Sequence, residues 1–268
     1  LCQKKNSGSS AARNAGINQA QGTWLSFVDS DDWVTEDYIS AMYEVAQSDD
    51  ADIVMCSVYY YYSEEKYKEV CPFDNLTTES SHKEKIAFSR SYPCSRLFRK
   101  SLFVENGIFF PEDIWRGEDI GTIIPILTKT DKISLLSRPM YFYFQHPSSK
   151  SSSNSSLVDV TFYPKTINRM LMLSALGFNE ELEFRAVLEL LYGMIMIMVK
   201  AGYQTIKIKR QIEEVLKQYP KWRNNKYYKE IAIEKRIFML CASRKKIYLL
   251  KILILFRELL QKVKGEGV

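Results

Sequence analysis

Paired cysteines and long apolar runs are both missing from this 268-residue chain. Its five cysteines stand singly, without any CxxC pair, which gives no support for a zinc knuckle or a disulfide framework and fits a reducing compartment. Internal repeats and long biased stretches are also lacking, which argues against disorder. With 46% hydrophobic residues, the chain can bury a core for one large domain or two modest ones.

Charge is unevenly distributed along the chain. From Lys200 onward there are 18 Lys and Arg against 6 Asp and Glu, whereas residues 1–199 carry 19 basic and 26 acidic residues. An acidic front and a basic tail predict two units. Strand patterns end before Val158, so we expect an α/β domain over 1–157 and a helical region over 158–268.

Periodicity in the front half alternates between helix and strand. It predicts a small-residue helix over 9–21, a strand over 24–28, a helix after Thr35 and a strand over 51–62. Further along it predicts a surface excursion over 64–84, a helix over 117–127 and two strands over 132–137 and 140–145. This alternation favours a layered α/β sheet with flanking helices.

Three carboxylates crowd the end of the strand predicted over 24–28: Asp29, Asp31 and Asp32. Ligands of open α/β sheets bind beyond the carboxyl ends of strands, and carboxylates there offer hard oxygen ligands to Mg²⁺ or Mn²⁺. Substrate phosphates would then complete the coordination shell. The alternative, favoured for a DxD taken alone, is that these acids cap the next turn and stay solvated.

Two other segments carry residues suited to the same chemistry. Arg13 and Asn14, in "ARNAG", lie on the helix before the strand, where a guanidinium can balance the acids. Glu118 and Asp119 open the helix predicted over 117–127. They are either helix-capping acids or a general base held by rigid structure.

Taken together, these stretches resemble glycosyltransferase family 2, bacterial enzymes with a GT-A fold. The resemblance rests on "NSGSSAARNAGINQAQGTWLSFVDSDDWV", "CSRLFRKSLF", "GEDIGTIIPIL" and "RPMYFYF". It implies a nucleotide-sugar-binding α/β sandwich in which Asp29 and Asp31 hold Mn²⁺ or Mg²⁺ on the donor's diphosphate. Arg13, Asn14 and Asp29 would bind the donor, and Asp119, beside Glu118, would deprotonate the acceptor hydroxyl.

The resemblance also bears on two further residues, His146 and Arg96. It implies that His146, after the last predicted strand, is an additional metal ligand, although an exposed loop histidine is the alternative. Arg96 stands where relatives often have Lys, which suggests a part in acceptor binding. His82 has no such placement, and we expect it at the surface.

The family pattern normally begins with two strands that grip the nucleotide, and this chain starts after them. We therefore expect an N-terminally incomplete GT-A domain that is poorly stable alone and binds nucleotide weakly.

The basic tail over 243–264 has an apolar face interrupted by Lys251 and Arg257. Its apolar run is too short to cross a membrane. It either packs on the domain or lies in a membrane interface, where lysines favour anionic lipid, and we expect the second. No RNP-like strand, finger spacing or recognition helix accompanies it, so nucleic acid is not an expected partner.

The function implied is an inverting, metal-dependent hexosyltransferase. It would move sugar from a nucleotide-diphosphate donor, a UDP-sugar, to a cell-surface glycan or lipid-linked acceptor, in the cytoplasm or on the inner face of the cell membrane. Two alternatives stay open. One is a haloacid-dehalogenase-like phosphatase, although Trp33 stands where that group has Thr or Val. The other is a non-catalytic, truncated, membrane-associated remnant.

Overall fold

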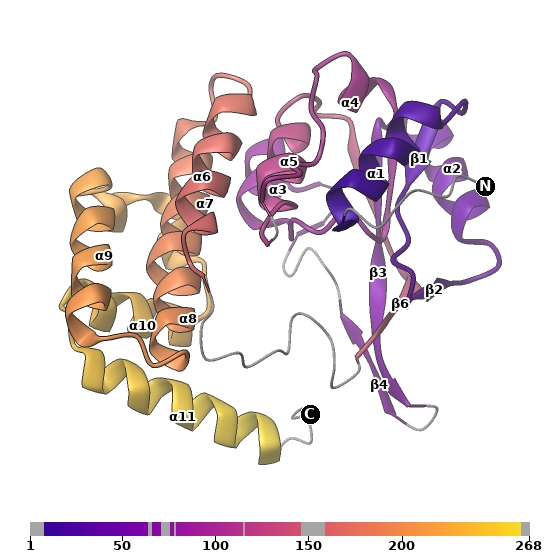
Figure 1. Cartoon of the computed structure of the whole chain (residues 1–268). Coiled ribbons are helices and arrows are strands. Elements are labelled where there is room, and N and C mark those ends of the chain that lie inside the picture. The colour runs from indigo at the N-terminus through magenta and orange to yellow at the C-terminus, as the bar shows by residue number, and fades with distance from the viewer. Residues whose placement is uncertain are drawn as a thin grey trace. The chain divides into compact units, whose positions relative to one another are not determined.

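The structure is a computed structural model and describes residues 8–63, 66–70, 76–77, 79–114, 116–145 and 159–263. The chain divides into two compact units, residues 1–145 with 165–178 and residues 146–164 with 179–268. Figure 1 shows a twisted sheet with helices in the first unit and helices in the second. The division expected at residue 157 stays a prediction, because that position lies outside the described residues.

The first unit has an α/β architecture. Its elements are α1 (Gly8–Gln19), β1 (Trp24–Ser26), β2 (Trp33–Val34), α2 (Tyr38–Ser48), β3 (Ile53–Ser63), β4 (Lys66–Val70), α3 (His82–Phe88), β5 (Arg96–Arg99), α4 (Ser101–Val104), α5 (Ile120–Leu127), β6 (Ile133–Phe144) and, from Lys165 onward, α6 (Phe162–Leu173). The α/β class, the small-residue helix and the strands expected near residues 24–28 and 51–62 are confirmed.

One mixed sheet organises this unit, in the order β1-β5-β3-β6-β2, with β4 paired to β3. The pair β3 and β6 is parallel, from Ile53 opposite Ile133 to Tyr61 opposite Phe144, and the other described pairs are antiparallel. These two strands lie side by side along their length (Figure 1). They connect the buried centre of the sheet to its more exposed end.

Two expectations about the strands were wrong. The two strands expected over 132–137 and 140–145 form the single strand β6, because a register irregularity opposite Pro139 absorbs the break that this proline introduces. The surface excursion expected over 64–84 contains β4, which pairs with the tyrosine-rich end of β3, and the start of α3.

The main core lies between α2 and the sheet. Tyr38, Met42 and Ala46 recur every four residues on α2 and are buried, which places them on one helix face. They pack against buried residues of β3, β5 and β6, including Val54, Cys56, Leu97, Met140 and Tyr141. This core fixes the position of β6, and Tyr141 of that strand also contributes to the candidate active site.

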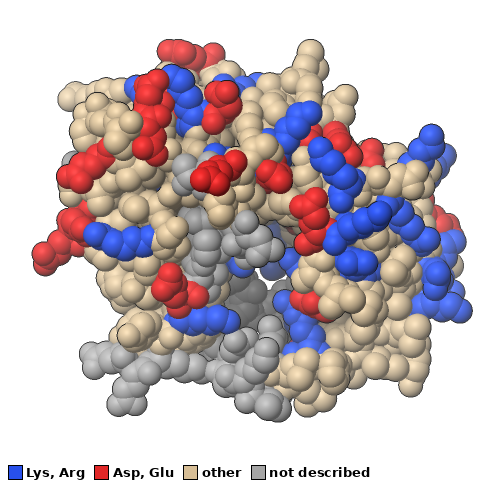
Figure 2. Space-filling view, turned by 180° about the vertical axis from the view of Figure 1, so that it is seen from behind, with Lys and Arg blue, Asp and Glu red and all other residues tan. Residues whose placement is uncertain are grey.

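The second unit is helical throughout its described part, as expected after Val158. Its elements are α7 (Asn179–Val187), the π-helix η1 (Leu188–Met194), α8 (Ile195–Lys200), α9 (Thr205–Gln218), the 3₁₀ turns η2 (Trp222–Asn224) and η3 (Lys226–Lys229), α10 (Ile233–Ser243) and α11 (Ile247–Val263). In Figure 2, Lys and Arg side chains gather over this unit. Among the described residues, none of the helices has both the length and the apolar content needed to span a bilayer.

Candidate active site

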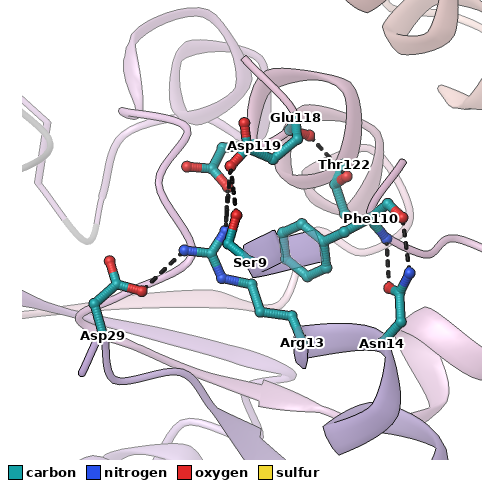
Figure 3. Close-up of polar contacts among 8 residues, drawn as sticks. All are labelled: Ser9, Arg13, Asn14, Asp29, Phe110, Glu118, Asp119 and Thr122. Atoms are coloured by element: carbon teal, nitrogen blue, oxygen red, sulfur yellow. Dashed lines mark hydrogen bonds and ion pairs between the residues drawn. The ribbon is translucent and has the colours of Figure 1, made fainter. Parts of the chain in front are cut away.

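Arg13 joins two acids, Asp29 and Asp119, that are ninety residues apart in the chain (Figure 3). Its Nη2 donates to Asp29 Oδ1 at 2.9 Å, and its Nη1 donates to Asp119 Oδ1 at 3.0 Å and lies 3.6 Å from Glu118 Oε1. The side chain is only 12% exposed, and its guanidinium lies over the Phe110 ring at 5.2 Å from the centroid. A rigid, charged fork therefore holds the end of β1 beside the start of α5.

Asp29 and Asp31 lie in the turn after β1. The Asp29 carboxylate is 42% exposed, so one oxygen can accept from Arg13 while the group still faces solvent. Asp31 is exposed. The turn is closed by the Asp32 N–H, which donates to the Asp29 carbonyl at 3.1 Å. The two acids of the DxD pair therefore share one short, open turn.

The Asp32 carboxylate stabilises this turn through hydrogen bonds within the protein and is not directed toward a ligand. Tyr141 Oη donates to Asp32 Oδ2 at 2.6 Å, and the Phe144 N–H donates to Asp32 Oδ1 at 2.9 Å. The same Tyr141 oxygen accepts the Asp29 N–H at 3.1 Å. Burial raises the pKa of Asp32 to about 6, and the two hydrogen bonds it accepts oppose that rise.

Asp119 has the environment of a general base. It stands at the N-terminal end of α5 without a side-chain capping bond and is 26% exposed. Burial raises its pKa to about 7; the Arg13 charge opposes that rise and the Glu118 charge adds to it. Glu118 is 14% exposed and accepts from Ser9 Oγ at 3.3 Å. A carboxyl with a pKa near neutrality, beside an open turn of acids, is suited to proton transfer.

Asn14 lies one residue from Arg13 but contacts another part of the chain (Figure 3). Its Nδ2 donates to the Phe110 carbonyl, and its Oδ1 accepts the Phe110 N–H, both at 2.8 Å. It thereby holds in place the ring that lies beneath Arg13. The structure thus brings together Arg13, Asp29, Glu118 and Asp119, with Asn14 supporting them from the side.

The remaining candidates have different outcomes. His146 falls outside the described residues. Arg96 is fully buried in β5, where its Nη2 donates to the Arg90 carbonyl. His82, expected at the surface, is half-buried, because its Nε2 lies 2.6 Å from the Leu127 carbonyl and its ring contacts Phe178.

The donor set of the turn suits a hard divalent cation. Within the part of the chain that the structure describes, no group of three or more His, Cys, Asp or Glu residues has the geometry of a complete metal site. Mg²⁺ and Mn²⁺ sites that use substrate phosphates need only one or two protein carboxylates, and the Asp29–Asp31 turn offers two. The residues present therefore fit a metal whose remaining ligands come from a substrate.

The comparisons with known proteins concern the family and the fold. Residues 1–107 match the family model described as glycosyl transferase family 2. The family resemblance is thereby confirmed. The chain is 30% identical over 157 residues to the uncharacterized glycosyltransferase EpsJ of Bacillus subtilis, covering 56% of this chain and 45% of that protein. It is 31% identical over 195 residues to the cholesterol galactosyltransferase of Borreliella burgdorferi, covering 67% and 53%.

Solved structures show the same fold. Staphylococcus aureus TarS 1–349 in complex with UDP superposes with a TM-score of 0.63 at 17% identity, covering 94% of this chain and 71% of that chain. The complex with UDP-GlcNAc gives 0.55 at 18% identity, covering 94% and 72%. This chain therefore has a GT-A-like fold, as expected. It spans about half the length of the first curated relatives it matches.

Sequence reasoning missed three residues of the site, Ser9, Phe110 and Tyr141. The Tyr141 hydroxyl connects Asp32 to the Asp29 N–H, yet in sequence Tyr141 is one of several aromatic residues in "MYFYF". Alternation along the strand offered a signal, because Tyr141 and Tyr143 share one face of β6 while Phe142 and Phe144 share the other. Only the three-dimensional register shows which of these rings reaches the acids.

Proposed function

We propose that this protein is a glycosyltransferase that moves a sugar from a nucleotide-diphosphate donor, a UDP-sugar, to an acceptor hydroxyl. One observation carries the proposal: Arg13 links the open Asp29 turn to Asp119, so that an acid pair for the donor and a candidate base for the acceptor share one site. The family match and the GT-A-like fold support this class. Neither supports the haloacid-dehalogenase-like alternative.

The donor would bind at the turn after β1. Asp29 and Asp31 would hold Mn²⁺ or Mg²⁺ on the diphosphate, and His146 stays a predicted additional ligand. When bound, such an ion supplies Lewis-acid stabilisation of the departing diphosphate. Arg13 places a second positive charge against Asp29 and offsets the crowded carboxylates. Asn14 would contribute to donor binding through Phe110, which holds the Arg13 guanidinium in position.

The acceptor hydroxyl would lose its proton to Asp119. A carboxyl with a pKa of about 7 is largely ionised slightly above neutral pH and is still basic enough to accept a proton. Glu118 raises that pKa, and Ser9 orients Glu118 by a hydrogen bond. Attack of the deprotonated hydroxyl on the face of the sugar opposite the leaving diphosphate would invert the anomeric centre.

The acceptor would be a hydroxyl of a cell-surface glycan or of a lipid-linked acceptor. Relatives are named for a poly(ribitol phosphate) and for cholesterol as acceptors, so lipid and polymeric acceptors both occur among similar proteins. Helix α11 supports contact with a membrane. Ile247, Leu250 and Ile254 are buried and Leu253 is half-buried, whereas seven other apolar side chains are exposed: Tyr248, Leu249, Ile252, Leu255, Phe256, Leu259 and Leu260.

That exposed apolar side carries basic neighbours. Lys246 and Lys251 are exposed on the same segment, and the whole region after Lys200 is strongly basic. An amphipathic helix of this kind lies in the headgroup region of anionic membranes, with its apolar side chains toward the acyl chains. We therefore propose that α11 holds the protein peripherally on the inner face of the cell membrane.

Titration calorimetry of UDP with and without Mn²⁺ tests the donor site. We expect UDP uptake to depend on Mn²⁺, and Asp29→Ala and Asp31→Ala each to weaken it by tenfold or more. Asp119→Asn should keep UDP binding and lose turnover, and Glu44→Gln, at an exposed acid on α2, should change neither. Metal-independent binding, or full turnover by Asp119→Asn, would refute these assignments.

A further inference from the structure

Six aromatic side chains gather on one face of the sheet beyond the core. They come from four neighbouring strands: Trp33 from β2, Phe142 and Phe144 from β6, Tyr59 and Tyr61 from β3, and Tyr67 from β4. The register aligns them in two rows. Trp33 and Tyr59 are both paired with Phe142, and Tyr61 is paired with both Phe144 and Tyr67. Strand β4 pairs with the end of β3 that carries these tyrosines (Figure 1).

The rings of this aromatic face contact one another directly. Trp33 stacks on Phe142 with centroids 5.3 Å apart and an interplanar angle of 10°, and Tyr59 stacks on Phe142 at 4.9 Å and 27°. Tyr61 meets the edge of Trp33 at 4.8 Å, and Tyr59 meets Tyr67 at 5.6 Å. Such contacts between neighbouring rings preorganise the face, since each ring restricts its neighbour.

The face is open as well as ordered. Trp33 is 40% exposed and Tyr67 is 62% exposed, and the other four rings are partly exposed. A contiguous exposed apolar patch of this kind on a folded protein marks a binding surface. Its tyrosines add hydroxyl groups, which lets the face hold an amphipathic ligand.

The aromatic face continues directly from the candidate active site. Trp33 follows Asp32 in the chain, and the Phe144 N–H donates to the Asp32 carboxylate. The same strand β6 thus presents Tyr141 to the acidic turn and Phe142 and Phe144 to the aromatic face. A ligand that lies on these rings would therefore reach the Asp29 turn.

We propose that this aromatic face binds the pyranose rings of the acceptor glycan. A pyranose presents C–H groups on its flat faces and hydroxyl groups at its rim, which suits aromatic rings bordered by tyrosine hydroxyls. The aromatic face continues into the acidic turn, where the sugar to be transferred would bind. The end of the acceptor glycan must lie beside that sugar, so we assign the face to the acceptor. The inference rests on the proposed glycosyltransferase function; it narrows the acceptor to a glycan and says where that glycan binds.

Saturation-transfer NMR and calorimetry with two soluble probes, chitotetraose and maltotetraose, test the proposal on the full chain. We expect at least one probe to bind, and Tyr67→Ala to weaken that binding roughly 3- to 10-fold, the range of one aromatic contact. Tyr67 is the ring to change first, because it is the most exposed and lies on an outer strand. Trp33→Ala should weaken binding at least as much.

The control is Tyr43→Ala on α2, where an aromatic ring of similar exposure to Trp33 lies outside the face. It should leave probe binding unchanged, and Tyr67→Ala should leave Mn²⁺-dependent UDP binding unchanged. Absence of probe binding, or equal binding by wild type and Tyr67→Ala, would overturn the acceptor assignment while UDP binding still supported the donor site. A change of oligomeric state or of vesicle binding in Tyr67→Ala would assign the face to a second copy or to lipid and would equally overturn it.

Discussion

Replacing Arg13 with glutamine should shift the pH dependence of turnover in a direction that the structure fixes. Arg13 lies 3.0 Å from Asp119, and its charge opposes the rise by which burial brings the pKa of Asp119 to about 7. Removing the positive charge therefore raises the pKa of Asp119 further. An opposite charge at this range is worth about 1–3 pKa units, and the 26% exposure of Asp119 favours the lower end.

The expected loss of rate follows from the ionised fraction. A base with a pKa of about 7 is roughly three-quarters ionised at pH 7.5, and a rise of about 1–2 units leaves roughly a quarter to a thirtieth ionised. Turnover of Arg13→Gln at pH 7.5 and saturating donor should therefore fall about 3- to 30-fold, beyond any change in donor KM. It should recover as the pH rises toward 9, because the base acts in its deprotonated form.

The assay is UDP release against pH for wild type, Arg13→Gln, Arg13→Lys and Arg99→Gln. Arg13→Lys keeps the charge without the two-pronged geometry, so its acidic limb should stay near that of wild type. Arg99→Gln is the matched control, since it removes an ion pair to Asp52 elsewhere on the sheet. An acidic limb that stays in place in Arg13→Gln, or that moves equally in Arg99→Gln, would refute the electrostatic argument.

Two further predictions concern stability and membrane contact. The pKa of Asp119 is higher in the folded protein than in the unfolded chain, so ionisation of Asp119 destabilises the folded state as the pH rises from about 4 to 7. Asp119→Asn should therefore raise the Tm measured by scanning calorimetry at pH 8, and this gain should vanish near pH 4. A gain that persists at pH 4 would contradict this. Leu255→Ser with Phe256→Ser should lower co-sedimentation with anionic vesicles by on the order of tenfold, since both side chains are about 60% exposed on α11. Met172→Ser with Leu176→Ser, at even more exposed apolar positions, is the control and should pellet like wild type; equal pelleting of both double variants would exclude α11 as the membrane contact.

Local chemistry made much of the fold readable from the sequence. Short stretches of sequence were enough to predict three elements: α1 from its small residues, β1 from its apolar run, and β3 from its β-branched and aromatic residues. The boundaries were less accurate, because they depend on tertiary contacts. Thr35 precedes α2 but does not cap it: the helix begins at Tyr38, whose N–H donates to the Thr35 carbonyl. Pro139 did not divide β6, because β3 accommodates the irregularity.

The acids of the candidate site could be named from sequence, but their relationships could not. Asp29 and Asp119 are ninety residues apart in the chain, and only the packing of α1 between them shows that one guanidinium serves both. Sequence likewise placed Asn14 with the donor, whereas its amide is paired with the Phe110 backbone. Such pairings depend on side-chain direction, and a spacing rule along the chain does not encode it.

The undivided strand β6 restricts how this protein can change. Its alternate residues serve opposite sides: Tyr141 steadies the acidic turn, while Phe142 and Phe144 belong to the exposed rings. A one-residue insertion there would turn every side chain to the wrong side and disturb both at once. New specificity on this scaffold should therefore arise by exchanging individual rings, and homologues with altered acceptors should keep the length of this strand.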